Sequence, residues 1–219
     1  TGVEKIVETD EATYIGKAII VATGRKPIPL ALPECEQVHY CSVCDGFPYA
    51  GGRVLVVGGG NSGFDESLYL KRIGITHLTL IEVADRYFAA KSTQDEFFRQ
   101  SDVEGRLNTK IVGINMDNGI LTSAVLENVK TGETDILPVD GIFAFLGQKP
   151  STDFLKGLVD LDVDGYVIAN EDMSTNIPGV YSAGDLNRKR YRQLTTAMND
   201  GTIAALACEK YLSSVKNAC

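Results

Sequence analysis

The chain has 219 residues, is 44% hydrophobic and carries a formal net charge of −8 at pH 7. This length and apolar content suit one large or two modest globular domains, each with its own core. The acidic balance argues against nucleic acid or an anionic membrane as a partner, and no apolar run is long enough to predict a membrane span. Five cysteines with one close pair, and no apolar signal segment at the start, indicate the cytoplasm.

The first part of the chain predicts strands that lead to a crossing between domains. Residues 18–24 are a short apolar run with β-branched side chains that ends in Gly24, which is typical of a buried strand. Residues 25–33 hold three prolines, which cannot continue a hydrogen-bonded ladder or a helix. We therefore expect a linker there.

Cys41 and Cys44 are separated by two residues, and Asp45 follows Cys44 directly. This spacing allows the sulfurs to close a small disulfide, and a position in the first turn of a helix would lower the pKa of the Cys44 thiol. The thiolate is the form that attacks disulfides, and Asp45 stands where it can protonate a thiolate leaving group. The pattern is compatible with redox chemistry, and by itself it leaves half of a zinc site or two structural thiols as open alternatives.

The other thiols and imidazoles do not extend this pair into a metal site. A structural zinc ion needs four ligands, and the remaining candidates form no second close pair, so we expect no bound metal: Cys35, Cys208, Cys219, His39 and His77. Cys208 is expected in a helix core, and Cys35 and Cys219 are expected to take no part. His39 stands two residues before the pair, where it either packs or tunes the thiols, and we favour packing.

A glycine motif of the form G-x-G-x-x-G occupies residues 58–63. A buried strand is predicted before it at 53–57 and a helix after it at 64–72, which is the context that dinucleotide binding requires. A second strand at 77–81 ends in Glu82, about 20 residues after the motif, where an acid binds ribose hydroxyls. The alternative is that the glycines only pack helix on strand. The candidate nucleotide-binding residues are Gly58, Gly60, Asn61, Ser62, Gly63 and Glu82.

The remaining chain predicts further strands and one long helix. An amphipathic segment is expected at 97–107. Strands are predicted after it at 110–114, in a hairpin of 121–129 with 135–137, at 141–147 and at 165–168. Residues 148–150 are predicted as a second domain crossing. Asp185 follows Gly184 at a strand end, where it either binds ligand hydroxyls or makes an ordinary turn. An Ala- and Leu-rich helix is expected over 195–212.

In this order the motifs resemble the low-molecular-weight thioredoxin reductases, and they are also similar to the flavoprotein subunit of alkyl hydroperoxide reductase. The matching stretches are the cysteine pair with its flanks, the glycine motif, and residues 22–24, 178–185 and 191–193. The match covers essentially the whole chain, and the combination is far more specific than any single motif.

The resemblance implies an α/β fold with two Rossmann-like, three-layer nucleotide-binding domains. An NAD(P)-binding domain with the Cys-x-x-Cys redox centre, residues 38–145, is inserted in an FAD-binding domain formed by residues 1–37 and 146–219. The first βαβ unit of that FAD-binding domain has no match in this sequence, so we expect residues before Thr1 in the native protein. The alternatives are a second polypeptide that supplies the unit, or loss of FAD binding.

The resemblance also implies roles for single residues. Cys44 faces the flavin, Cys41 attacks the protein substrate, and Asp45 is the acid–base residue. Six further residues are implied to line the FAD site: Thr23, Gly24, Gly184, Asp185, Arg192 and Gln193. NADPH-using members carry His-Arg-Arg where this chain has Glu82, Val83 and Ala84. A glutamate repels a 2′-phosphate and accepts from a 2′-hydroxyl, so NADH is expected rather than NADPH.

The function that the resemblance implies is a flavin-dependent disulfide oxidoreductase. Electrons pass from NAD(P)H through FAD and the Cys41–Cys44 disulfide to a thioredoxin-like or glutaredoxin-like protein. A cytoplasmic homodimer is implied as well. Two alternatives stay open: the same flavoprotein scaffold reduced by ferredoxin or another donor, and a non-catalytic nucleotide-binding module.

Overall fold

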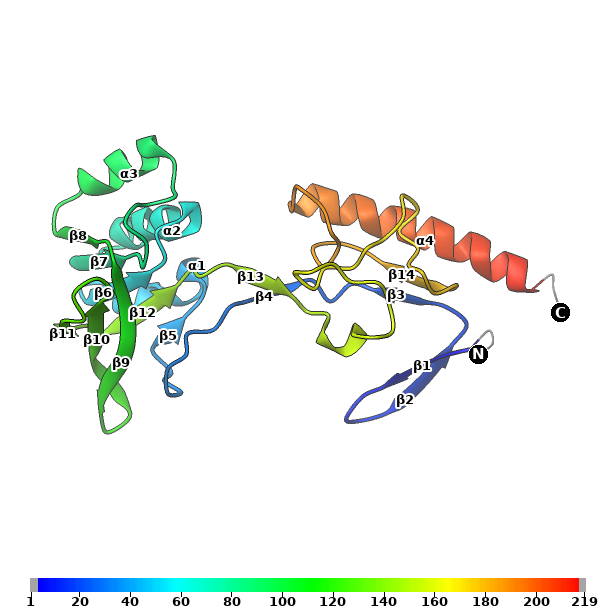
Figure 1. The fold of residues 1–219 in the computed structure, drawn as a ribbon, viewed down its shortest axis with the longest axis horizontal. Coiled ribbons are helices and arrows are strands. Elements are labelled where there is room, and N and C mark those ends of the chain that lie inside the picture. Colours follow the sequence, from blue (N-terminus) through cyan, green and yellow to red (C-terminus); the bar gives the residue numbers. More distant parts are fainter. Residues whose placement is uncertain (1–3, 217–219) are drawn as a thin grey trace. The chain divides into compact units, whose positions relative to one another are not determined.

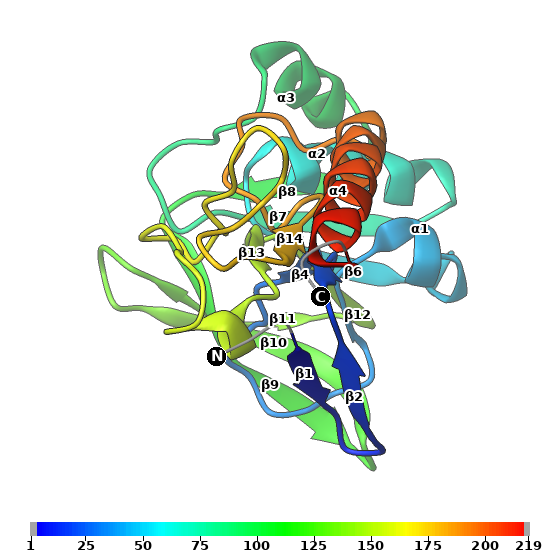
Figure 2. The same ribbon diagram turned by 90° about the vertical axis from the view of Figure 1, so that its right-hand side faces the viewer.

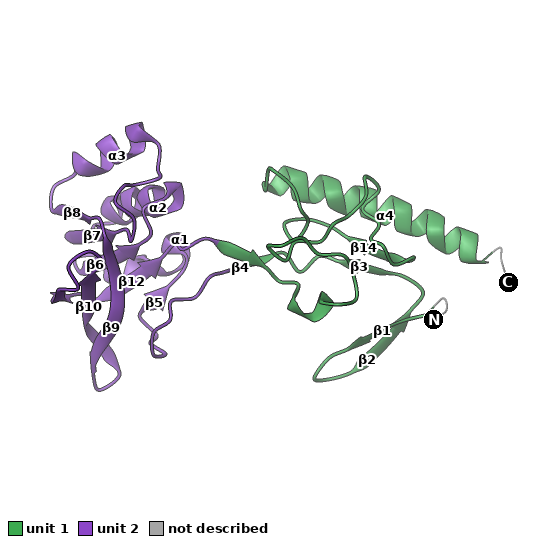
Figure 3. Cartoon of the chain, viewed as in Figure 1, with its two compact units in different colours: residues 1–26, 148–219 green, residues 27–147 purple. Residues whose placement is uncertain are grey.

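The computed structural model describes residues 4–216 and divides into two compact units (Figures 1 and 3). One unit is Thr1–Lys26 together with Gln148–Cys219, and the other is Pro27–Gly147. Cys219 lies outside the described residues. Within the described part of the chain, no helix has the length and apolar character needed to cross a membrane.

The two segments at the crossings pair with each other. β4 (Arg25–Pro27) and β13 (Gln148–Pro150) form a two-stranded ladder, so the expectation of an unpaired linker is wrong at its first residues. Each strand ends in proline, and a two-stranded ladder has only edges, where a missing N–H is tolerated. The units divide here rather than after residues 37 and 145, because Leu30 and Cys35 pack on the core of the second unit. Which nucleotide each unit binds stays a prediction.

The unit of residues 27–147 is built on a parallel sheet in the order β5-β12-β6-β7-β8. Its strands, in chain order, are β5 (Val38–His39), β6 (Arg53–Val57), β7 (His77–Ile81), β8 (Val103–Arg106) and β12 (Gly141–Ala144). The central strands β6 and β7 are nearly continuous apolar runs because both faces of the sheet are covered.

Different layers cover the two faces of this sheet. On one face α2 (Asn61–Arg72) and α3 (Lys91–Phe98) bury Phe64 and Phe97 completely. On the other lies an antiparallel sheet with the order β11-β10-β9, whose strands are β9 (Thr109–Asp117), β10 (Ile120–Asn128) and β11 (Thr134–Pro138). The three-layer α/β arrangement implied by the sequence is therefore confirmed.

Two predicted elements differ from the structure. The amphipathic segment at 97–107 is the end of α3 followed by β8, separated by a turn in which Asp102 has a φ of 56°. The apolar residues of these two successive elements are spaced like those on one face of a single helix, which explains the wrong prediction. The strand predicted at 165–168 makes only isolated bridges, at Val167.

The other unit consists of small ladders against a long helix. β3 (Ile19–Val21) runs parallel to β14 (Val180–Ser182), and α4 (Leu194–Lys216) packs on them. β1 (Lys5–Glu8) and β2 (Thr13–Gly16) form a hairpin, drawn in dark blue in Figure 2. A single turn, η2 (Asp153–Leu155), follows β13.

Candidate active site

The cysteine pair forms a disulfide directly after β5. Cys41 caps the short helix α1 (Ser42–Asp45), and its sulfur is bonded to that of Cys44 at 2.05 Å. The helical turn returns the chain so that the Cα atoms of the two cysteines lie 5.3 Å apart. The Cys44 N–H donates to Sγ of Cys41 at 3.2 Å, so a backbone donor of the turn already contacts one sulfur.

The surroundings of the disulfide are open to solvent. Cys44 is exposed, and so are the neighbouring apolar side chains of Val43 (66%) and Phe47 (77%), the latter in η1 (Phe47–Tyr49). Thiol–disulfide exchange requires that another sulfur approach in line with the bond. This side of α1 permits that approach.

A polar cluster of His39, Asp45 and Tyr49 stands beside the disulfide, and its contact with Tyr49 was not predicted from the sequence. Nε2 of His39 lies 2.6 Å from the Tyr49 hydroxyl, and Nδ1 of His39 lies 3.6 Å from Oδ2 of Asp45. The ring of His39 also packs on Phe143 of β12, with centroids 5.1 Å apart. Burial lowers the pKa of His39, and the Asp45 carboxylate opposes this with a smaller effect. No sequence pattern marks Tyr49, because the contact arises only where β5 and η1 meet.

The glycine motif links β6 to α2 and is shaped for close approach of a ligand. Gly58 has a φ of 116°, and a Cβ there would lie 2.5 Å from the Phe145 carbonyl oxygen. Gly63 packs against the loop so closely that a Cβ would overlap the Gly58 carbonyl. Gly60 is the N-cap of α2 with no side-chain hydrogen bond, and space beyond it is open. These features fit a pyrophosphate at the helix N-terminus.

Glu82 follows β7 directly and reaches this loop. Its Oε2 accepts the Gly59 N–H at 2.7 Å, and its Oε1 accepts the Ala84 N–H at 3.0 Å. The predicted acid is therefore at the glycine loop. Asn61 holds the same region from the other side, since its Oδ1 accepts the Ala90 N–H at 2.9 Å. Its side chain is thus engaged within the protein, and Ser62 is exposed beside it.

In the other unit, Thr23 and Gly24 follow β3 at its carboxyl end. The Thr23 hydroxyl donates to the Ser151 carbonyl at 2.8 Å. Gly24 has a φ of 63°, and a Cβ added there would meet no atom within 4 Å. The turn is thus held by a side-chain bond while the glycine leaves open space next to it.

Asp185 provides the strongest indication of a ligand in this unit. Its Oδ1 is buried without a hydrogen-bond partner, and so is Nε of Arg25, whose guanidinium lies 3.6 Å from Oδ2 of Asp185. A buried polar atom without a partner is costly, and a ribityl hydroxyl would satisfy it. The neighbouring Gly184 N–H donates to the buried Asp200 carboxylate at 3.1 Å, and Lys189 pairs with the same oxygen at 2.8 Å.

Arg192 and Gln193 precede α4. The Arg192 guanidinium stacks on the Tyr166 ring at 4.1 Å and its Nε donates to the Asp185 carbonyl at 3.4 Å. The Gln193 N–H donates to the Thr196 hydroxyl at 3.0 Å. Among the expected FAD-lining positions, a hydrogen bond joins Arg192 to Asp185 directly. Thr23, Gly184 and Gln193 bond to other residues of the same unit.

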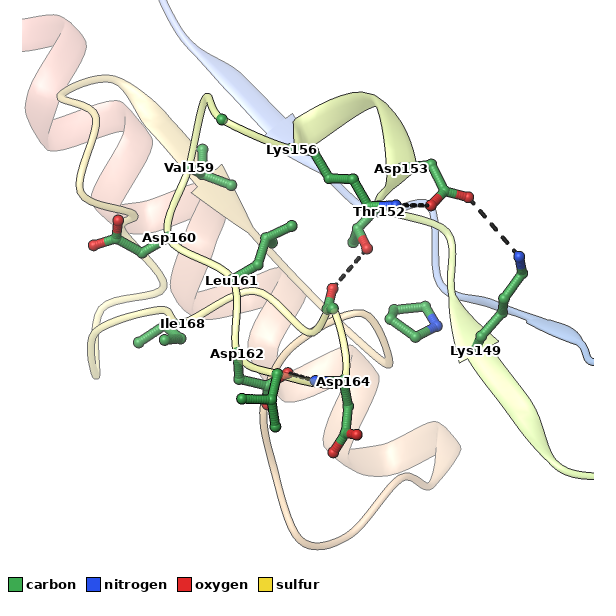
Figure 4. Close-up of a pocket in the computed structure, with 14 residues that line it drawn as sticks. Lys149, Thr152, Asp153, Lys156, Val159, Asp160, Leu161, Asp162, Asp164 and Ile168 are labelled. Carbon is green, nitrogen blue, oxygen red and sulfur yellow. Dashed lines mark hydrogen bonds and ion pairs between the residues drawn. The ribbon is translucent and has the colours of Figure 1, made fainter.

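A hollow of about 660 Å³ in the same unit does not form a second site (Figure 4). Its cations are paired internally, since Lys156 lies 2.8 Å and Lys149 4.0 Å from Asp153. Asp162 accepts the backbone N–H groups of Asp164 and Tyr166. Among residues 4–216, His, Cys, Asp and Glu form no group of three or more suited to a metal ion.

The exposed disulfide and the α/β fold are typical of a disulfide oxidoreductase, and comparison with known proteins gives the family. Residues 2–201 match the model of the pyridine nucleotide-disulphide oxidoreductase family. The chain is 41% identical to the "34.2 kDa protein in rubredoxin operon" of Clostridium pasteurianum, over 95% of this chain and 69% of that protein. It is 37% identical to the thioredoxin reductase of Peptoclostridium acidaminophilum, over 96% of this chain and 70% of that protein.

A solved structure agrees with these relatives. The crystal structure of Lactococcus lactis thioredoxin reductase superposes with a TM-score of 0.83 at 35% sequence identity, over 98% of this chain and 72% of that one. The chain belongs to the pyridine nucleotide-disulphide oxidoreductase family and, within it, to the low-molecular-weight thioredoxin reductases. The resemblance is thereby confirmed, and with it the class of flavin-dependent disulfide oxidoreductases.

Proposed function

We propose that the chain reduces the disulfide of a thioredoxin-like or glutaredoxin-like protein through the Cys41–Cys44 couple. The observation that carries this proposal is a disulfide on an exposed helical turn at the entry of a unit with a dinucleotide-type glycine loop. When bound, FAD supplies a two-electron reductant for this disulfide, itself renewed by a pyridine nucleotide. The family assignment favours this enzyme over a module without turnover.

The residues of the turn divide the chemistry between them. Two electrons and two protons convert the disulfide into two thiols. The Cys41 thiolate attacks the substrate disulfide, one substrate thiol leaves, and a mixed disulfide remains. Cys44 then attacks Cys41, which re-forms the original bond and releases the second substrate thiol. The Cys44 N–H on Sγ of Cys41 favours negative charge there, which supports Cys41 as the attacking sulfur. Asp45 takes and returns the proton.

The residues near Asp185 fit the flavin. Asp185 and Arg25 offer the unpaired buried atoms that a ribityl hydroxyl would satisfy. Thr23, Gly24 and Gly184 shape the turns next to them. We assign the flavin ring to the side of Arg192 and Gln193, as the family match implies.

The nicotinamide nucleotide belongs, in this proposal, to the loop of residues 58–63 and to Glu82. The amides after Gly60 would hold the pyrophosphate, and Glu82 would accept from a ribose hydroxyl. Val83 and Ala84 offer no cation for a 2′-phosphate, and the Arg86 guanidinium stacks on the Phe88 ring at 5.3 Å. This supports NADH over NADPH.

A small electron-transfer protein is the second candidate donor. The Clostridium pasteurianum relative is named for its place in a rubredoxin operon, and this context favours such a donor. The glycine loop would then have no part in turnover. The Cys41–Cys44 chemistry would be unchanged.

We further propose a homodimer that works in the cytoplasm. A thiol reductase acts where thiols stay reduced, and the free thiols of Cys35 and Cys208 are compatible with such a compartment. Light scattering on the eluting protein measures the oligomeric state, and a monomer mass would contradict the dimer.

Anaerobic titration of the purified protein tests the donor and the substrate together. NADH is expected to bleach the flavin absorbance, and oxidised thioredoxin is expected to restore it. Bleaching by reduced ferredoxin alone would select the second donor. Reoxidation that is equally fast in Cys41→Ser would reject the disulfide reductase assignment.

A further inference from the structure

His39 is placed by the sheet so that both of its ring nitrogens meet polar groups beside the redox pair. It lies in β5, opposite Phe143 of β12, and its side chain is only 17% exposed. Such a half-buried imidazole between aromatic rings has little access to water. The Tyr49 hydroxyl at 2.6 Å and the Asp45 carboxylate at 3.6 Å are its polar neighbours.

The protonation of this cluster follows from its surroundings. Burial raises the pKa of Tyr49, so its hydroxyl keeps the proton with which it can donate to Nε2 of His39. The proton of the neutral ring then lies on Nδ1, the nitrogen that faces Asp45. Cys35 is the remaining titratable group near the cluster, and it acts on Tyr49 rather than on His39.

We propose that His39 is a positioning residue for the redox pair, with Nδ1–H orienting and stabilising the Asp45 carboxylate while Tyr49 holds the ring through Nε2. This rests on the proposed disulfide reductase function. When a dithiol attacks a disulfide, each departing thiol proton needs an acceptor, and Asp45 is in the same helical turn as both cysteines. His39 keeps that acceptor aimed at the pair, without touching the sulfurs.

The test uses the full chain with the other cysteines replaced: Cys35→Ser, Cys208→Ser and Cys219→Ser. The protein is reduced with dithiothreitol, desalted and mixed with dithiobis(nitrobenzoate) over a range of pH. One cysteine sulfur attacks a dye sulfur and releases one nitrothiobenzoate. The second cysteine closes the Cys41–Cys44 bond and releases the other, so two electrons and two protons leave the protein. This readout needs no flavin.

His39→Gln is expected to shift the acid side of the rate profile to higher pH, with a loss of about threefold or more at a pH on that slope. His39→Asn keeps an N–H at the position of Nδ1 and is expected to retain most of the rate. His77→Gln, in the second histidine of the chain, is the matched control and should follow the parent profile. In a protein that already carries Asp45→Asn, adding His39→Gln should cause no further loss of rate.

Four outcomes would overturn either the positioning role of His39 or the reductase assignment. A His39→Gln profile that superposes on the parent profile overturns the positioning role. So does a double variant whose loss of rate equals the product of the losses of His39→Gln and Asp45→Asn. Equal losses in His39→Asn and His39→Gln would also overturn it, since packing alone would then explain the effect. Failure of the parent protein to re-form the Cys41–Cys44 bond, read by mass, would overturn the reductase assignment instead.

Discussion

Cys41, Cys44 and Asp45 share one turn of helix, so a change of one atom there alters the chemistry without disturbing the core. Serine has nearly the shape of cysteine but forms no disulfide. Both positions lie outside the buried clusters of the unit. Chemistry and stability are therefore separable at this site.

The first prediction uses that separation. Cys41→Ser and Cys44→Ser should each abolish reduction of thioredoxin by the holoenzyme. Cys44→Ser should keep most of its NADH-dependent reduction of a dye, because that route does not need the cysteine pair. Steady-state assays with both acceptors measure the difference, and full thioredoxin turnover in either variant would contradict the assignment.

The second prediction concerns the titration of His39. Burial holds the pKa of His39 below its ordinary value of 6.5, and the Asp45 carboxylate raises it by less. Asp45→Asn should therefore lower the pKa of His39 further, which NMR of the imidazole protons measures. A higher value in this variant would contradict the arrangement of the cluster.

The same shift makes stability depend on pH. The unfolded chain binds a proton at His39 more readily than the folded chain. The stability that depends on neutral His39 is therefore complete above about pH 6.5, and it is lost as the pH falls through the pKa of His39 in the folded chain. His39→Gln should flatten the slope of unfolding free energy against pH in that window. Urea unfolding at several pH values gives the slope, with His77→Gln as the comparison.

At the scale of elements, the segment that joins β7 to α3 carries the choice of nucleotide. Glu82 at its start would lie close to a 2′-phosphate, and a like-charge contact near a protein surface costs on the order of 1 kcal/mol or more. That is about a tenfold preference in binding. We therefore predict a lower KM for NADH than for NADPH.

The matched variant combines Glu82→Ala with Val83→Arg and Ala84→Arg and should shift the preference toward NADPH. Steady-state kinetics with both nucleotides measures the ratio. A parent enzyme that prefers NADPH would show that the role given to Glu82 is wrong.

A second element-scale prediction concerns the link between α4 and the turn at Gly184. Asp200 is 6% exposed, and its carboxylate binds the Gly184 N–H and the Lys189 ammonium. Asp200→Ala leaves both groups without their partner, which costs about 3 kcal/mol. Asp200→Asn should cost less because its oxygen still accepts from Gly184. Denaturant unfolding measures both, and the exposed Asp153→Ala control should leave the midpoint unchanged.

At the scale of the whole molecule, each unit has a core of its own. The parallel-sheet unit buries residues on both faces of its sheet within residues 27–147. We predict that this fragment folds alone, keeps the Cys41–Cys44 disulfide and shows one cooperative thermal transition by circular dichroism. A fragment without such a transition would show that the other unit is needed for folding.

The sequence alone determined the features that depend on neighbouring residues. The apolar runs at β6 and β7, the glycine turn between β6 and α2, and the Cys41–Cys44 turn are each set by side chains a few positions apart. Local periodicity and backbone conformation are enough to predict such elements. The prediction of one amphipathic segment at 97–107 was wrong because α3 and β8, two successive elements, together carry one apolar pattern.

Only the tertiary structure decided the contacts between distant segments. The Thr23 hydroxyl meets the Ser151 carbonyl 128 residues later, and Arg25 meets Asp185. His39, Asp45 and Tyr49 are close in sequence, yet their contact depends on β5 pairing with β12 from the far end of the unit. A hydrogen bond needs a direction and a distance within a few tenths of an ångström. Those are set by how whole elements pack, which no local pattern of residues contains.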